Sequence, residues 1–318
     1  SMRGDGAREL TVHRVRARRT RVERIQVVVQ LRERVRRAAP ARAGEIDRVV
    51  GDAAVGVKSS DRRAQARRQE ARRRVEALAA VAQDRGARRA IARGFALVDP
   101  ASGRTRHLGG SRLADPELRF NDGRCDRSGR FFFAGTMHLP RTRRAGTLYR
   151  LDSDGVQTAI AGDVLVSNGL AFSLDNRLMY WSCSRSRMIW KFDFDPSTGD
   201  ISNRRIFATP SEAQGRPDGA AVDAQGFYWS ACFGGGRVIR WSPDGRVDRE
   251  IEMPVTNCTM CAFGGSELKT LFVTSARDML SAEQLGAEPL AGALFALDPD
   301  ISGLPEAVFA LRHETPFS

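Results

Sequence analysis

Residues 188–199 read MIWKFDFDPSTG, an alternating apolar run that ends in an Asp-rich turn closed by glycine. The pattern recurs as GFALVDPASG at 94–103, GTLYRLDSDG at 146–155, RVIRWSPDG at 237–245 and ALFALDPDISG at 293–303. Alternation with period two is typical of a β-strand, and Asp with Gly favours a tight turn. The closing glycines are 52, 44, 46 and 58 residues apart. Such spacing is typical of propeller blades of about four short strands, so we predict an all-β fold with five blade repeats visible in residues 94–318.

Composition divides the 318-residue chain near residue 93. Residues 1–93 contain no Phe, Tyr, Trp or Cys, and they hold 26 of the 51 basic residues but 11 of the 38 acidic ones, a net charge of +15. The remaining residues carry a net charge of −2 and all of the aromatic side chains, which dominate the energetics of a packed core. We therefore separate an atypical Arg-rich segment, 1–93, from a propeller domain, 94–318.

Three interpretations of residues 1–93 remain open. Residues 61–92 are rich in Ala, Arg, Gln and Glu and favour helix, so the segment could be a solvated helical extension. It could also be a basic arm, or a shifted reading frame through a GC-rich gene that replaces the first blade. We do not expect a nucleic-acid partner, because without aromatic residues only phosphate contacts would be available.

The cysteines and the hydropathy of the chain indicate its compartment. Five cysteines occur without the spacing of a disulfide framework. Cys258 and Cys261 form a single CxxC without a second pair or a nearby His, so we favour buried thiols over a zinc site. The sequence has no run of about 18 apolar residues and no secretory h-region. We therefore expect a cytoplasmic protein with no membrane partner, and we make no prediction of its oligomeric state.

Three segments place polar residues where a strand should end in a turn. They are RFNDG from Arg119, VSNGLAFS from Val166 and GRPDGAAVD from Gly215, and each is followed by an aromatic strand. Asn-Gly and Asp-Gly commonly form ordinary turns. However, Asn121, Asn168 and Asp218 recur 47 and 50 residues apart, so successive blades would bring them to one end of a central channel. Converging oxygen ligands suit a hard divalent cation.

These motifs resemble those of the regucalcin and gluconolactonase family, also called the senescence marker protein family. RFNDG, SNGL-x-F-S and G-x-PDG are its hallmark strings; CAFGG at 261–265, LFVTSA at 271–276 and AGALF at 291–295 match its later motifs. The resemblance covers roughly residues 94 to 310. It implies a six-bladed β-propeller that hydrolyses a sugar lactone to the aldonic acid with one divalent metal ion, calcium or zinc, with manganese or magnesium as alternatives.

The resemblance also implies roles for individual residues. Asn168 and Asp218 would be metal ligands, and Asp218 would also be the catalytic general base. Arg119 and Asn121 would bind the substrate near the metal.

Two departures from the family pattern concern the site. The LGEGP-x-W motif that supplies the first metal ligand is absent; Glu33 is the tentative replacement, and Glu45 is a weaker one. The acidic residue often found after GTM is replaced by His138, Leu139, Pro140 and Arg141, and we expect His138 to lie in a surface loop. The alternative function is a catalytically impaired propeller that binds a ligand or partner.

Overall fold

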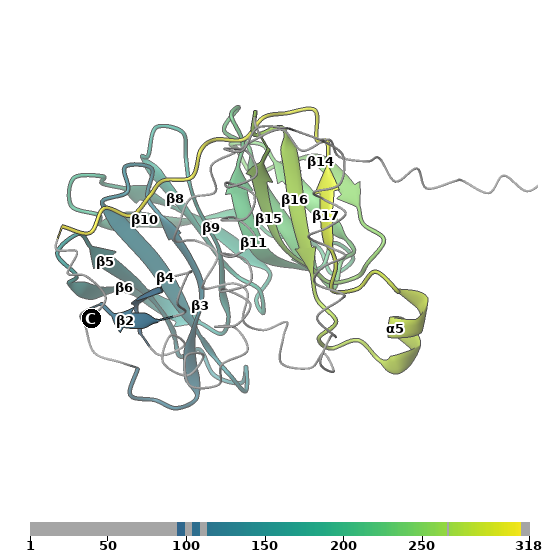
Figure 1. The fold of residues 1–318 in the computed structure, drawn as a ribbon, viewed down its shortest axis with the longest axis horizontal. Helices are drawn as coiled ribbons and strands as arrows, with labels where there is room; N and C mark the ends of the chain where they lie inside the picture. The colour runs from purple at the N-terminus through teal and green to yellow at the C-terminus, as the bar shows by residue number, and fades with distance from the viewer. Residues whose placement is uncertain (1–93, 99–103, 109–112, 266, 313–318) are drawn as a thin grey trace, which may run out of the picture.

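The computed structural model describes residues 94–98, 104–108, 113–265 and 267–312. These residues form strands and one short helix (Figure 1). The elements are β1 (Ala96–Val98), β2 (Thr105–His107), β3 (Leu118–Cys125), β4 (Phe131–His138), β5 (Gly146–Asp152), β6 (Gln157–Val164), β7 (Ser167–Phe172), β8 (Leu178–Cys183), β9 (Met188–Phe194), β10 (Ile201–Ala208), β11 (Arg216–Val222), β12 (Tyr228–Phe233), β13 (Arg237–Trp241), β14 (Val247–Glu252), β15 (Cys258–Gly264), β16 (Thr270–Ser275), α5 (Ala282–Ala287) and β17 (Leu294–Leu297).

Each sheet is an antiparallel meander in which successive strands pair. Three sheets have four strands, namely β3–β6, β7–β10 and β11–β14, and the fourth sheet, β15–β17, has three. The repeated turns join the third strand of a sheet to the fourth, as at Gly155, Gly199 and Gly245, whose φ angles are +84°, +75° and +85°. A positive φ is readily adopted by glycine, which explains why these three repeats close with this residue.

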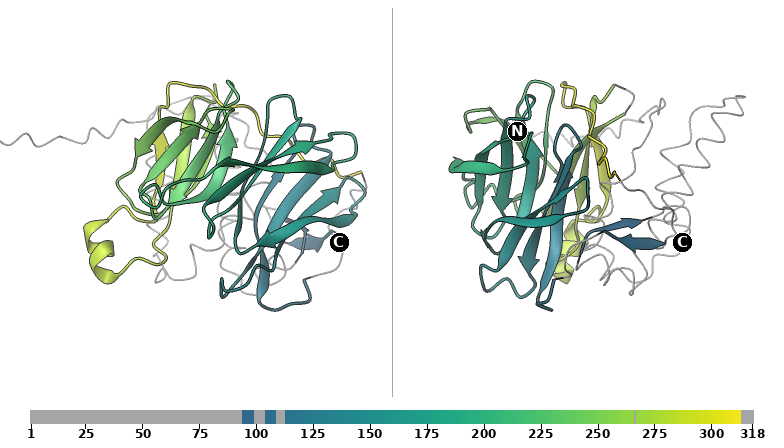
Figure 2. Two further views of the ribbon diagram at one scale, coloured as in Figure 1. Left: turned by 180° about the vertical axis from the view of Figure 1, so that it is seen from behind. Right: turned by 90° about the vertical axis from the view of Figure 1, so that its left-hand side faces the viewer.

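The four sheets are arranged as propeller blades. Strand β3 contacts β7, β7 contacts β11, and β11 contacts β15, so the first strand of each sheet faces the next sheet. Figures 1 and 2 show the sheets following one another from the blue-teal β3–β6 sheet to the yellow-green β15–β17 sheet. The propeller-like all-β fold is thereby confirmed.

The prediction of five blade repeats needs a correction within the described residues. The first repeat forms only a two-stranded sheet, β1–β2, because it supplies the third and fourth strands of a blade and no alternating sequence precedes it. The total of six blades stays a prediction. The predicted helix at 61–92 and the candidate ligands Glu33 and Glu45 lie outside the described residues.

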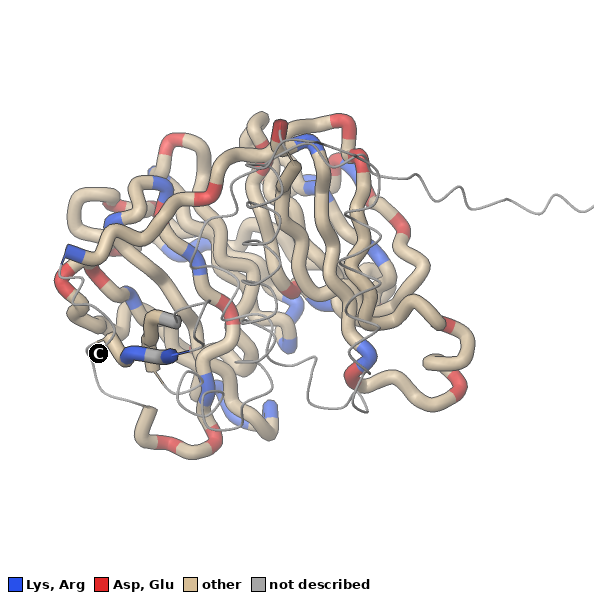
Figure 3. Tube along the Cα trace, in the orientation of Figure 1, with Lys and Arg blue, Asp and Glu red and all other residues tan. Residues whose placement is uncertain are grey.

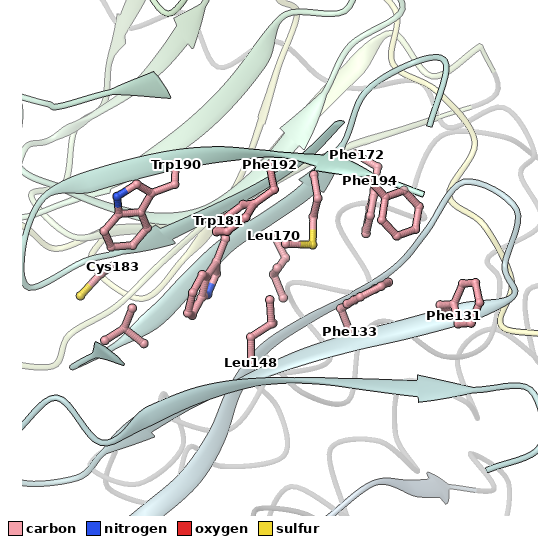
Figure 4. Close-up of a cluster of buried hydrophobic side chains, with 12 residues drawn as sticks. Phe131, Phe133, Leu148, Leu170, Phe172, Trp181, Cys183, Trp190, Phe192 and Phe194 are labelled. Atoms are coloured by element: carbon pink, nitrogen blue, oxygen red, sulfur yellow. The ribbon is translucent and has the colours of Figure 1, made fainter. Parts of the chain in front are cut away.

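Apolar clusters fill the spaces between neighbouring sheets. Phe133, Phe172, Trp181 and Phe194 pack between the β3–β6 and β7–β10 sheets (Figure 4), and each is at most 3% exposed. Burying one such side chain contributes roughly 1.5–3 kcal/mol relative to leaving it exposed. Similar clusters join the later sheets, so aromatic packing fixes the positions of the first strands.

The C-terminal segment ties the β15–β17 sheet back to the β3–β6 sheet. After β17 the chain crosses the molecule (yellow in Figure 1). The Ala310 amide then donates to Gly129 O at 2.8 Å, and the Arg312 amide donates to Ser153 O at 2.9 Å. A Cβ at Gly129 would lie 2.1 Å from Val308 O, so the close approach of these two segments of the chain requires glycine at this position.

The described residues carry interspersed charges of both signs, as Figure 3 shows. The basic excess of the sequence belongs to residues 1–93, which the structure does not describe. Among the described residues no helix is long and apolar enough to cross a membrane.

Candidate active site

Each first strand of the four sheets has an irregularity at the same place. Its pairing with the second strand shifts register between Phe120 and Gly123 in β3, and between Asn168 and Ala171 in β7. Equivalent shifts occur between Pro217 and Ala220 in β11, and between Cys258 and Met260 in β15. A β-bulge breaks the regular alternation and re-aims side chains. The motif residues Asn121, Asn168 and Asp218 lie at or beside these shifts.

The four irregular segments surround one pocket. Its lining includes Arg119 and Asn121 from β3, Asn168 from β7, Arg216 and Asp218 from β11, and Thr259 and Met260 from β15. The structure therefore brings together all four of the predicted site residues that it describes. Their sequence positions are separated by up to 99 residues, from Arg119 to Asp218, so packing of the blades creates the site.

Hydrogen bonds connect three blades beneath the pocket. The Asn121 side-chain amide donates to Asn168 Oδ1 at 2.9 Å and to Ser167 O at 2.7 Å. Asn168 Nδ2 donates to Ser184 Oγ at 2.6 Å, and that hydroxyl donates to Pro217 O at 2.6 Å. This chain orients the Asn168 amide and links it to the residue that precedes Asp218.

Glycines next to the motif residues allow the strands to approach closely. A Cβ at Gly219 would lie 2.1 Å from Met260 Sδ and 3.0 Å from Met260 Cα. Gly169 has a φ of +64°, and its carbonyl accepts from Tyr228 Oη at 2.9 Å. Burial raises the pKa of Tyr228 well above its usual value, so this phenol is a neutral donor. The Asn-Gly and Asp-Gly pairs therefore serve packing between blades as well as local turning.

Positively charged side chains also line the pocket. Arg141 from the loop after β4, Arg185 from the β8–β9 turn and Arg216 all line it. The Arg141 guanidinium also contacts Met279 Sδ at 3.4 Å. Arg141 was named from the sequence only within the segment that replaces the acidic residue after GTM. Five other residues that line the pocket were not identified from the sequence, namely Arg185, Arg216, Thr259, Met260 and Asp278. Of these five, only Arg216 could have been predicted from the sequence, because it lies in GRPDG, two residues before Asp218.

His138 is not in a surface loop, and that prediction was wrong. The residue ends β4, is 2% exposed, and lies within 3.2 Å of Glu117 Oε2. The Thr142 and Arg143 amides donate to His138 Nδ1 at 3.3 Å, so Nε2 carries the proton that faces Glu117, and the His138 contact is the largest cause of a lowered pKa at Glu117. These polar neighbours compensate for burying the imidazole, and Arg141 from the same segment reaches the pocket instead.

The predicted metal ligands share the pocket. Asn168 and Asp218 line it from neighbouring blades and would offer an amide oxygen and a carboxylate, the hard donors that calcium, magnesium and manganese favour. Within the described ranges no group of three or more His, Cys, Asp or Glu residues is placed to hold a metal. Cys258 and Cys261 are buried thiols, and burial raises the pKa of Cys261 to about 12.

Comparison with known proteins identifies the family. Residues 51–277 match the family model described as the SMP-30/gluconolactonase/LRE-like region, so the chain belongs to this family. The matched range begins at residue 51 and includes part of the Arg-rich segment. The family resemblance inferred from RFNDG, SNGL and PDG is confirmed.

Individual relatives agree with this assignment. The chain is 47% identical over 208 residues to a 6-deoxy-6-sulfogluconolactonase of Pseudomonas putida, covering 63% of this chain and 70% of that protein. It is 39% identical over 194 residues to regucalcin of Danio rerio, covering 60% and 65%. A calcium-binding regucalcin from Agrobacterium tumefaciens superposes with a TM-score of 0.65 and 29% identity, covering 69% of this chain and 74% of that chain. The chain thus spans 65% to 70% of the length of these two curated relatives.

Proposed function

We propose that this chain is a lactonase that hydrolyses a sugar lactone of the gluconolactone type to the aldonic acid. The carrying observation is that Arg119, Asn121, Asn168 and Asp218 line one pocket in a chain of the gluconolactonase family. The names of relatives in Pseudomonas putida and in Bacillus subtilis, a 6-deoxy-6-sulfogluconolactonase and a putative sugar lactone lactonase, support this substrate class.

Asp218 is the proposed general base. Its carboxylate would take a proton from a water as that water attacks the lactone carbonyl carbon. The ring C–O bond would then break, and the proton would pass to the departing ring oxygen, which leaves a hydroxy acid. A positioned base contributes roughly 10²–10⁴-fold to such a reaction.

Arg119 and Asn121 are the proposed substrate-binding residues. Arg119 is 9% exposed and its guanidinium donates to Phe120 O at 2.9 Å, which restrains the side chain at the pocket. The Asn121 amide nitrogen already donates to two acceptors, so its oxygen is the atom suited to accept from a sugar hydroxyl.

Asn168 and Asp218 are the proposed ligands of a divalent cation, which would polarise the lactone carbonyl when bound. The donor set fits such an ion, because both residues offer hard oxygens in one pocket. The hydrogen bond from Asn168 Nδ2 to Ser184 Oγ fixes the amide, and its oxygen, which accepts from Asn121 Nδ2, keeps a second lone pair for a cation. Glu33 stays the tentative third ligand.

The test is hydrolysis of a panel of aldonolactones by the full chain after chelation and after addition of calcium, zinc, manganese or magnesium. We expect hydrolysis to disappear on chelation and to return with at least one metal. Activity that is unchanged by chelation would contradict the metal requirement. A folded protein that binds aldonolactones by calorimetry but hydrolyses none would instead support the alternative, a ligand-binding propeller.

A further inference from the structure

A tight turn after β4 carries Arg141 to the pocket. The turn spans residues 138–143, and the Arg141 amide donates to His138 O at 3.0 Å. Arg141 has a φ of +59°, in the left-handed region that costs a residue other than glycine roughly 1–2 kcal/mol. Its side chain lines the pocket and contacts Met279 Sδ at 3.4 Å. A strained residue of this kind persists only where neighbouring contacts hold it, and such residues are common at ligand sites.

The His138 side chain supplies those contacts. His138 is 2% exposed, and its Nδ1 accepts from the Thr142 and Arg143 amides, both at 3.3 Å. One imidazole nitrogen therefore holds the two peptide groups that follow Arg141. Because the His138 carbonyl holds the Arg141 amide as well, the backbone is fixed on both sides of the strained residue.

Neighbouring groups fix the imidazole itself. His138 Nε2 lies 3.2 Å from Glu117 Oε2, which accepts the Nε2 proton and leaves Nδ1 as the acceptor. Arg143 Nη2 donates to the same Glu117 oxygen at 3.2 Å. The His138 amide donates to Leu165 O at 3.1 Å, which ties the end of β4 to the connection between β6 and β7. Arg141 lines the pocket and His138 lies behind it, so the imidazole acts on the site through the turn.

We propose that Arg141 binds the substrate in the pocket and that His138 is the positioning residue that holds Arg141 there. The inference rests on the proposed lactonase function and adds to it one substrate contact and the residue that places it. A guanidinium presents several donors in a fixed plane, which suits the hydroxyl and ring oxygens of a sugar lactone. Loss of one hydrogen bond from a charged donor corresponds to about tenfold to hundredfold weaker binding.

The experiment measures KM and kcat of the full chain for its best aldonolactone. Arg141→Gln and His138→Leu should each raise KM about tenfold and change kcat less than about threefold, because Asp218 lies on another sheet, in β11. The double variant His138→Leu, Arg141→Gln should match Arg141→Gln within about twofold, since a residue that acts only through Arg141 has no effect once Arg141 is removed. A rise of about a hundredfold, the product of two independent losses, would overturn the positioning role.

Two polar replacements identify the imidazole nitrogen that holds the turn. Asn at position 138 places its oxygen close to the position of Nδ1 and can accept from the two amides, so His138→Asn should stay within about threefold of the native KM. Gln places its amide close to the position of Nε2 instead, so His138→Gln should raise KM about tenfold. This comparison stays informative if His138→Leu does not fold, and equal KM values for the two polar variants would contradict the proposal.

His107→Leu is the matched control for the loss of a histidine. His107 is exposed and lies in β2, so its replacement should leave KM and kcat unchanged. Native KM in Arg141→Gln, with lactone hydrolysis intact, would overturn the inference and leave the lactonase proposal standing.

Calorimetric titration with gluconate separates the two proposals if no lactone is hydrolysed. Affinity that is about tenfold weaker in Arg141→Gln and His138→Gln, but native in His138→Asn, would support the inference although the proposed activity had failed. Affinities that are equal or unmeasurable in the native chain and all three variants would overturn it.

Discussion

Replacing Ser184 with alanine should weaken both the fold and the site. The Ser184 hydroxyl accepts from Asn168 Nδ2 and donates to Pro217 O, both at 2.6 Å, and the residue is 9% exposed. Alanine removes both hydrogen bonds and leaves the donor and the acceptor in a place with little access to water. Each buried hydrogen bond contributes about 1 kcal/mol net, so the free energy of unfolding should fall by about 2 kcal/mol.

The loss is large enough to measure by thermal unfolding. For a domain of this size a change of 1 kcal/mol shifts Tm by roughly 2–4 °C, so Ser184→Ala should lower Tm by about 4–8 °C. Fluorescence of the buried Trp181 in β8 reports the same sheet. Because the Asn168 amide would lose its fixed orientation, kcat/KM for the best lactone should fall about tenfold.

Ser186→Ala is the matched control in the same turn. The Ser186 hydroxyl donates to Cys183 O at a longer 3.4 Å, so its removal should change Tm by less than about 2 °C. If Ser184→Ala and Ser186→Ala had the same Tm and the same kcat/KM, the hydrogen-bond chain would not organise the site.

Three further changes test the packing around the site. Asp223→Ala should lower the free energy of unfolding in urea by about 3 kcal/mol, because Asp223 is fully buried and pairs with Arg240. Removal of the more exposed Asp248 should lower it by less than about 1 kcal/mol. Equal losses for the two variants would contradict this ranking. Gly219→Ala should push β11 away from Met260 and lower the free energy of unfolding by about 1–3 kcal/mol. Gly162→Ala is the control and should leave stability unchanged, because its Cβ would lie 3.8 Å from the nearest described atom. Unchanged stability in both variants would contradict the close approach of β11 and Met260. Iodoacetamide at pH 8 should leave Cys258 and Cys261 unlabelled in the folded protein, because both are buried and the pKa of Cys261 is raised to about 12. If mass spectrometry found these cysteines alkylated without denaturant, β15 would be accessible to solvent.

The repeats in the sequence were sufficient to predict the blades, because each carries its own turn chemistry. Gly155, Gly199 and Gly245 close the turns where the pattern put them. The incomplete sheet β1–β2 could not be anticipated from its repeat, since GFALVDPASG matches the others equally well. The repeat at 293–303 likewise does not reveal that its sheet, β15–β17, has three strands among the described residues.

The candidate site was predictable only in part. Asn121, Asn168 and Asp218 could be predicted because they recur at one place in each blade, and the structure brings them to one pocket. Arg185 carries no such signal, since arginine is frequent throughout the chain and this residue lies in the turn between β8 and β9, whereas Arg141 was flagged only by its place after GTM. His138 was misjudged because a polar residue near a loop resembles a solvated one, and its partners Glu117 and Arg143 become neighbours only after β3 and β4 pair.

The most direct test of the central claim compares Asp218→Asn with Asp244→Asn in lactone hydrolysis. Both aspartates occur in the tripeptide Pro-Asp-Gly, but Asp218 lines the pocket, whereas Asp244 lies in the exposed β13–β14 turn, where the Ser242 hydroxyl lowers its pKa. If Asp218 is the general base, Asp218→Asn should lower kcat by about 10²-fold or more, and Asp244→Asn should stay within twofold of the native chain. Asp218→Asn with native kcat, in protein of unchanged Tm, would contradict the assignment of this pocket as the active site.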